Sequence, residues 1–271
     1  MRVLLTGAAG SIGRSLLAGL IEQGHEVVGL DLLPEPEGFD GSWHTVDCED
    51  PDAIAEVVAG ESLDAVVHLA GRPTESGLVE QLHSHTVATG AVLDAMVEHG
   101  VTRIVYASSN HAIGRVPHSE GPIDDTTPPR ADTFYGVAKV ATESLLRLYA
   151  DRYGIDAVAC RIGTFLPQPE AARHLATWLS PADCLRMVEA ALTCPAPGFA
   201  VIYGISANAR AWWDLEPGRR LGFEPQDDAE VFAAFLPTRA EDDFEASYAG
   251  GPFVGEALHR PALDRATDGP D

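Results

Sequence analysis

Two short stretches of the chain carry side chains that can move a proton. Tyr135 and Lys139 lie four residues apart in the run Tyr-Gly-Val-Ala-Lys, and Ser108-Ser109 close an apolar segment upstream. On a helix, positions i and i+4 share one face, so the ammonium group would lie beside the phenol. An adjacent cation favours the phenolate and would lower a pKa that is ordinarily about 10. With a serine hydroxyl on the same substrate oxygen, the set predicts a tyrosine base acting on an alcohol. The alternative is a plain amphipathic helix.

A glycine-rich turn near the start of the chain predicts a dinucleotide site. Gly7, Gly10 and Gly13 follow an apolar segment, residues 2–6, and open an amphipathic stretch. Glycines permit a tight turn and a close approach of the backbone to a pyrophosphate, which the amino end of the following helix would face. Asp31 ends the next apolar segment, where its carboxylate can accept hydrogen bonds from the adenosine ribose. The 2′-phosphate of NADP would be repelled there, so the sequence favours NAD.

A parallel sheet is needed to bring these residues together. Apolar runs alternate with amphipathic stretches over about the first 160 residues, which predicts βαβ units and a Rossmann-type, doubly wound parallel α/β sheet. We expect strands at 2–6, 26–31, 44–47, 64–69, 103–108 and 156–161, and helices at 11–23, 51–59, 79–99 and 134–153.

The rhythm of the pattern changes after Gly163. Prolines punctuate the remaining sequence, which contains a helical stretch at 182–193 and a strand at 199–203. We therefore expect an NAD-binding part, residues 1–163, and a small substrate-binding lobe, residues 164–271, packed closely against it. From Asp227 onward there are 11 acidic and 3 basic residues, and we expect the extremity of this acidic tail to be loosely ordered.

Charge and composition exclude several classes of partner. The 271 residues carry a net charge of −23, which argues against nucleic acid and against anionic membranes. No apolar run reaches the roughly 18 residues of a membrane span, and the amino terminus lacks the features of a signal peptide. The four cysteines lie far apart, so neither zinc nor a disulfide framework is expected. We expect a cytoplasmic protein that forms a homo-oligomer.

With these residues in view, the chain resembles the extended short-chain dehydrogenase/reductase superfamily and, within it, is similar to uronate dehydrogenases. The similarity runs from Arg2 to about Phe253, and its most specific stretches are residues 106–114, 161–164 and 204–213. It implies oxidation by NAD⁺ at C1 of a cyclic uronic acid, D-glucuronate or D-galacturonate, to the aldarolactone.

The resemblance also implies a role for individual residues. Tyr135, Lys139 and Ser109 would be catalytic. Asn110, His111, Thr164 and Thr74 would contact the sugar, and Arg173 would hold its carboxylate. The expected cofactor-binding residues are Gly7, Gly10, Ser11, Ile12, Gly13, Asp31, Leu32, Asp47, Cys48, Leu69, Ala70, Gly71, Tyr135, Lys139 and Ile162.

Some assignments have a competing interpretation. Asp47 would meet the adenine edge or cap the following helix. His111 would line the sugar site or satisfy a backbone carbonyl, and Arg173 would bind substrate or form a surface ion pair near Glu170. His85 stands where the superfamily usually has an asparagine that bends the helix and relays protons. For the whole protein, the alternatives are a nucleotide-sugar epimerase or dehydratase and a non-catalytic NAD sensor.

Overall fold

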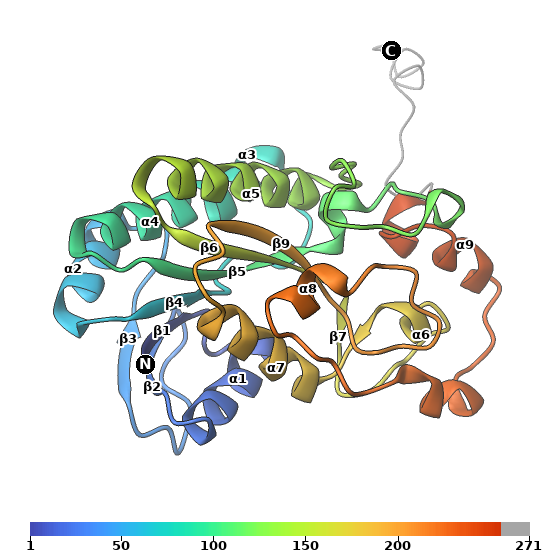
Figure 1. Cartoon of the computed structure of the whole chain (residues 1–271), viewed down its shortest axis with the longest axis horizontal. Helices are drawn as coiled ribbons and strands as arrows, with labels where there is room; N and C mark the ends of the chain where they lie inside the picture. The colour runs from blue at the N-terminus through green and yellow to red at the C-terminus, as the bar shows by residue number, and fades with distance from the viewer. Residues whose placement is uncertain (256–271) are drawn as a thin grey trace, which may run out of the picture.

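Seven parallel strands form the central sheet of the molecule (Figure 1). The structure is a computed structural model and describes residues 1–255. The strand order is β3-β2-β1-β4-β5-β6-β9, with every neighbouring pair parallel. The strands are β1 (Arg2–Thr6), β2 (Glu26–Asp31), β3 (Ser42–Thr45), β4 (Ala65–His68), β5 (Arg103–Ser109), β6 (Asp156–Ile162) and β9 (Phe199–Gly204). The expected Rossmann-type sheet is confirmed.

Helices cover both faces of this sheet, as Figure 1 shows. On one face lie α1 (Ser11–Glu22) and α7 (Pro181–Thr193), which pack on each other; on the other lie α2 (Pro51–Glu61), α4 (Ala88–His99) and α5 (Phe134–Tyr153). Successive side chains of β1 enter opposite cores, since Val3 and Leu5 join one apolar cluster and Leu4 the other. A strand buried on both faces needs apolar residues throughout, which explains its unbroken hydrophobic run.

Most elements differ from the expected bounds by one or two residues at their ends, but one strand is displaced as a whole and one helix is divided. The third strand occupies 42–45 instead of 44–47, because the Asp47 carbonyl accepts a hydrogen bond from the amide of Asp50 and turns the chain into α2. The expected helix at 79–99 divides into α3 (Leu78–Gln81), a π-helical turn (Leu82–Val87) and α4. In that turn the His85 carbonyl accepts the hydroxyl of Thr89, 2.5 Å away. Because a π-helical turn has backbone bonds from i to i+5, the helix is wider at His85 than a regular α-helix.

The chain after Gly163 does not form a separate layer. Strand β9 comes from this part and forms one edge of the main sheet, and α7 covers one face of that sheet beside α1. The remainder builds a small lobe from β7 (Thr164–Phe165), α6 (His174–Thr177), β8 (Trp178–Leu179), α8 (Glu216–Arg220) and α9 (Asp242–Ala246). The division at residue 163 stays a prediction, and the end of the acidic tail, 256–271, lies outside the described residues.

No helix within residues 1–255 is both long and apolar enough to cross a membrane. The same residues contain no group of three or more histidine, cysteine or acidic side chains arranged to hold a metal ion.

A buried ion pair fixes α5 to the sheet. Arg161 on β6 donates to both carboxylate oxygens of Glu143 on α5, at 2.9 and 2.8 Å, and the two side chains are 4% and 7% exposed. Ser108 donates to the same carboxylate at 2.6 Å. Arg161 also donates to the hydroxyl of Tyr203 on β9, 3.1 Å away. One carboxylate thus joins α5 to strands β5 and β6, and through Arg161 to β9.

We expect Arg161→Met to destabilise the fold strongly. The substitution keeps an apolar stem but leaves the Glu143 carboxylate buried without its cation, which lowers the free energy of unfolding by about 3–5 kcal/mol. Urea denaturation would measure the loss, and the double variant Arg161→Met, Glu143→Gln should recover part of it. A loss of about 0.5 kcal/mol, typical of a surface substitution, would contradict this role.

Candidate active site

A cleft of about 940 Å³ lies along the carboxyl ends of the strands. Its centre lies at β1, between β2 and β4. From β1 the strand order continues through β2 and β3 to one edge of the sheet and through β4, β5, β6 and β9 to the other. Open parallel sheets bind ligands at such switch points. Every residue expected to bind the cofactor lines this cleft, and so do Ser109, Asn110 and His111. Thr74, Thr164 and Arg173 are not among its lining residues.

The glycine turn fits a dinucleotide. Gly7 has a φ of +69°, and a Cβ atom there would lie only 2.8 Å from the amide nitrogen of Ala70. The amino end of α1 has no side-chain cap, so its first amides have no side-chain acceptor and can face an anion. The residues present therefore fit the pyrophosphate of NAD.

Two aspartates mark the adenosine end of the cleft. The carboxylate of Asp31 accepts the amides of Ala9 at 2.9 Å and Leu33 at 3.0 Å, which fixes it beside the glycine turn. Asp47 accepts the amide of Glu49 at 2.9 Å, whereas the cap of α2 is Asp50. The capping alternative for Asp47 was therefore wrong, and its contact with the adenine edge stays a prediction.

The three expected catalytic side chains meet at the amino end of α5. Lys139 is 3% exposed, and its Nζ lies 5.2 Å from the ring centre of Tyr135 and donates to the carbonyl of Ala107 at 2.7 Å. Burial lowers the pKa of Lys139 to about 7, although the carboxylate of Glu143 opposes this shift. Ser109 Oγ accepts the amide of His111, 3.2 Å away.

The phenol of Tyr135 differs from expectation. Burial raises its pKa to about 12, and the hydrogen bond with Ser109 only partly opposes the shift. The expectation that Lys139 lowers this pKa was wrong for the protein alone. The ammonium group is itself poorly solvated and bonds to a backbone carbonyl, so it does not offset the loss of water around the phenol.

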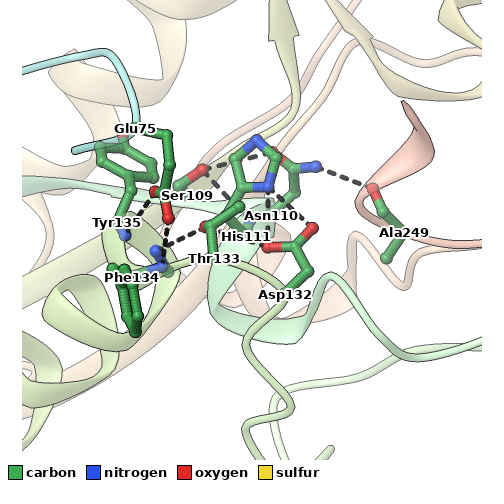
Figure 2. A network of polar contacts seen from close by, with 10 residues as sticks. Glu75, Ser109, Asn110, His111, Asp132, Thr133, Phe134, Tyr135 and Ala249 are labelled. Atoms are coloured by element: carbon green, nitrogen blue, oxygen red, sulfur yellow. Dashed lines mark hydrogen bonds and ion pairs between the residues drawn. The ribbon is translucent and has the colours of Figure 1, made fainter. Parts of the chain in front are cut away.

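Asn110 and His111, which are expected to contact the sugar, are held by separate segments (Figure 2). Asn110 is 4% exposed and donates to the carbonyl of Ala249 at 2.7 Å. His111 Nδ1 lies 2.9 Å from the carboxylate of Asp132. The alternative in which His111 satisfies a backbone carbonyl was therefore wrong.

Arg173 does not line the cleft and is partly buried. Its Nε atom is buried without a hydrogen-bond partner, and the guanidinium forms no ion pair with any residue of the described chain. Burial lowers its pKa, and the nearby carboxylates of Glu245 and Asp132 oppose that shift. The surface ion pair considered with Glu170 is absent from residues 1–255. A cation without a partner is suited to an anionic ligand.

Thr74 and Thr164 have local roles in this structure. The Thr74 carbonyl accepts a hydrogen bond from the side chain of Gln81 at 2.6 Å. The hydroxyl of Thr164 lies 3.0 Å from that of Thr177. Their contacts with substrate remain predictions.

His85 lies in the π-helical turn and lines the cleft. Its ring is 2% exposed and packs edge-on against Tyr135, with 5.1 Å between ring centres. Burial lowers its pKa to about 3, and the charge of Lys139 lowers it further. The neutral ring donates from Nε2 to the carbonyl of Arg72 at 3.0 Å, so Nδ1 is an acceptor, which has no partner among residues 1–255. Gly71, with a φ of +150°, leaves room for the ring.

Sequence reasoning missed Glu75, which the structure brings to the amino end of the catalytic helix (Figure 2). Its carboxylate accepts the amides of Phe134 at 2.8 Å and Tyr135 at 3.0 Å. It also missed Asp132 and Phe253, whose ring lies 4.7 Å from that of His111. Each comes from a loop or short turn, where no spacing rule marks a functional residue.

A dinucleotide cleft that ends at a half-buried tyrosine, a buried lysine and a buried serine defines a nicotinamide-dependent oxidoreductase. Sequence comparison makes the class more specific. The profile of the NAD dependent epimerase/dehydratase family matches residues 3–190, and the chain belongs to this family.

Individual relatives show which members of the family this chain resembles. Uronate dehydrogenase from Pseudomonas putida is 38% identical over 93% of this chain and 95% of its own length. A solved mutant of uronate dehydrogenase from Agrobacterium tumefaciens, complexed with NAD, has a TM-score of 0.88 and 34% identity, covering 96% of this chain and 99% of that chain. NAD-dependent glucose-6-phosphate dehydrogenase from Haloferax volcanii is 34% identical over 85% of this chain and 95% of that protein.

We expect His85→Asn to be tolerated and His85→Leu to lower turnover by about tenfold, the value of one hydrogen bond. Asparagine keeps a donor for the Arg72 carbonyl. Leucine leaves that carbonyl without a donor and places no polar atom beside Tyr135. Steady-state kinetics of both variants would measure the difference. Equal activity of the two variants would show that His85 only fills space.

Proposed function

We propose that this chain oxidises the C1 hydroxyl of a cyclic uronic acid, D-glucuronate or D-galacturonate, to the aldarolactone with NAD⁺. Similarity to uronate dehydrogenases over more than nine-tenths of the chain supports this reaction. The observation that carries the substrate class is Arg173, a partly buried cation with no acidic partner in the described residues. It lies beside Asp132, the partner of His111 on the sugar side of the cleft.

Proton transfer is assigned to Tyr135. Bound NAD⁺ supplies the two-electron acceptor and a positive charge at this end of the cleft. Tyr135 as phenolate takes the proton of the anomeric hydroxyl, and Ser109 orients that hydroxyl by hydrogen bonding to its oxygen. Because burial alone raises the pKa of the phenol to about 12, the phenolate needs the nearby positive charge of Lys139 and of the cofactor.

Recognition of the carboxylate is assigned to Arg173. A chain with a net charge of −23 repels an anionic substrate at long range, so a local cation must reverse the field. A guanidinium suits this role because its planar fork can donate two hydrogen bonds to one carboxylate. Asn110 and His111, which line the cleft together with Tyr135, would bind the sugar hydroxyls.

The two alternatives receive less support. A nucleotide-sugar epimerase is less supported, because the relatives that match more than nine-tenths of the chain are uronate dehydrogenases. A non-catalytic NAD sensor has no need of Tyr135 and Lys139. The cytoplasmic location and the homo-oligomer remain predictions.

Arg173→Met should separate uronates from neutral sugars. The variant should lose about 2–5 kcal/mol of transition-state binding for glucuronate and galacturonate, because their carboxylate is left desolvated and unpaired. NADH formation with uronates, glucose, galactose and glucose 6-phosphate would be followed for the unmodified enzyme, for Arg173→Met and for the exposed control Arg147→Met. Neutral sugars should be nearly inert throughout. Glucose oxidised as well as glucuronate, or unchanged uronate kinetics in Arg173→Met, would overturn the assignment.

Tyr135→Phe should lower turnover by about 100-fold or more, since it removes the base and keeps the shape of the ring. Binding of NADH, followed by its fluorescence, should persist. Near-normal turnover in Tyr135→Phe would place the base elsewhere.

A further inference from the structure

Asp132 is a buried carboxylate that the tyrosine mechanism does not use. Its side chain is 0% exposed, and both its oxygens face Nδ1 of His111, at 3.0 and 2.9 Å. The hydroxyl of Thr133 donates to it at 3.2 Å. Thr133 is also the cap of α5. The carboxylate therefore lies between the catalytic helix and the sugar side of the cleft.

Backbone from two distant segments encloses this carboxylate. A Cβ atom on Gly114 or on Gly250 would overlap an Asp132 oxygen. The two segments are joined, because the amide of Gly250 donates to the carbonyl of Gly114 at 2.8 Å. The backbone around the Asp132 carboxylate therefore leaves it no room to turn away from His111.

The ring of His111 is held on both sides. It meets Tyr135 edge-on, with 5.8 Å between centres, and Phe253 with 4.7 Å. Its side chain lines the cleft and is 17% exposed. Figure 2 shows Nδ1 directed at Asp132 and the other ring nitrogen pointing away from it. His111 Nε2 makes no hydrogen bond to any residue from 1 to 255.

The carboxylate decides which nitrogen carries the proton. An ionised carboxylate only accepts hydrogen bonds, so Nδ1 must donate. A neutral imidazole has one N–H, and Nε2 is then a bare acceptor. An acceptor at this place in the cleft can receive a hydrogen bond from a hydroxyl of a bound sugar.

We propose that Asp132 is a positioning residue, which holds His111 with Nε2 bare as the acceptor for the sugar hydroxyl next to the reacting carbon, on C2. The inference rests on the proposed function, since it places C1 at Tyr135. A site built to hydrogen-bond a hydroxyl discriminates against the analogue that lacks it. Asp132 thereby contributes to the choice of sugars without touching them.

Asp132→Asn tests the proposal, because an amide can accept from Nδ1 or donate to it and so permits both forms of the ring. For a uronate, kcat/KM should fall by about tenfold or more, whereas for the 2-deoxy analogue the fall should be less than about threefold. The same change in an His111→Ala background should have little further effect on either substrate. Asp183→Asn, which alters an equally buried carboxylate away from the cleft, controls for loss of charge and stability.

Equal losses of activity with both substrates, or an undiminished loss in the His111→Ala background, would overturn the proposal and reduce Asp132 to a structural role. A second measurement needs no Asp132 variant. In the unmodified protein with NAD bound, ¹⁵N chemical shifts of His111 distinguish a bare ring nitrogen from a protonated one, and His111→Ala assigns the signal. A bare Nε2 supports the proposal, and a protonated Nε2 with bare Nδ1 overturns it. Absence of uronate oxidation in the unmodified enzyme would instead contradict the proposed function.

Discussion

The carboxylate of Glu143 is the point on which the geometry of the site depends. It accepts hydrogen bonds from Arg161 on β6 and from Ser108, the neighbour of Ser109 on β5. Glu143 is also one helical turn from Lys139 and two turns from Tyr135, on the same side of α5. Ser109 and Tyr135 come from separate elements, β5 and α5. The contacts of the buried Glu143 carboxylate hold these two elements together. The proposed catalytic side chains are therefore held by the same contacts as the buried core behind them.

Much of the nucleotide-binding half could be predicted from the sequence. Its strands are buried on both faces and read as continuous apolar runs, and the glycine turn and Asp31 have roles set by backbone geometry. The spacing of Tyr135 and Lys139 on one helix is also a local property. All these residues line one cleft in the structure. Sequence reasoning succeeds here because each signal is contained within a few neighbouring residues.

The sugar side could not be predicted in the same way. Asp132, Glu75 and Phe253 lie in loops or short turns, and their partners are far away in the chain. The pKa of Tyr135 was predicted in the wrong direction for a related reason: spacing reveals the neighbouring lysine but not how far the fold removes water from the phenol. Burial and long-range contacts are collective properties of the folded chain, so a motif does not contain them.

The contact between His85 and Gly71 makes these two positions interdependent. The ring of His85 occupies the space that any side chain at position 71 would need, and the φ of +150° at Gly71 is itself unfavourable for other residues. A side chain at position 71 would therefore require the His85 ring to move away from Tyr135 and from the Arg72 carbonyl. The smallest residue of the chain thus sets the position of an aromatic side chain that borders the reacting phenol.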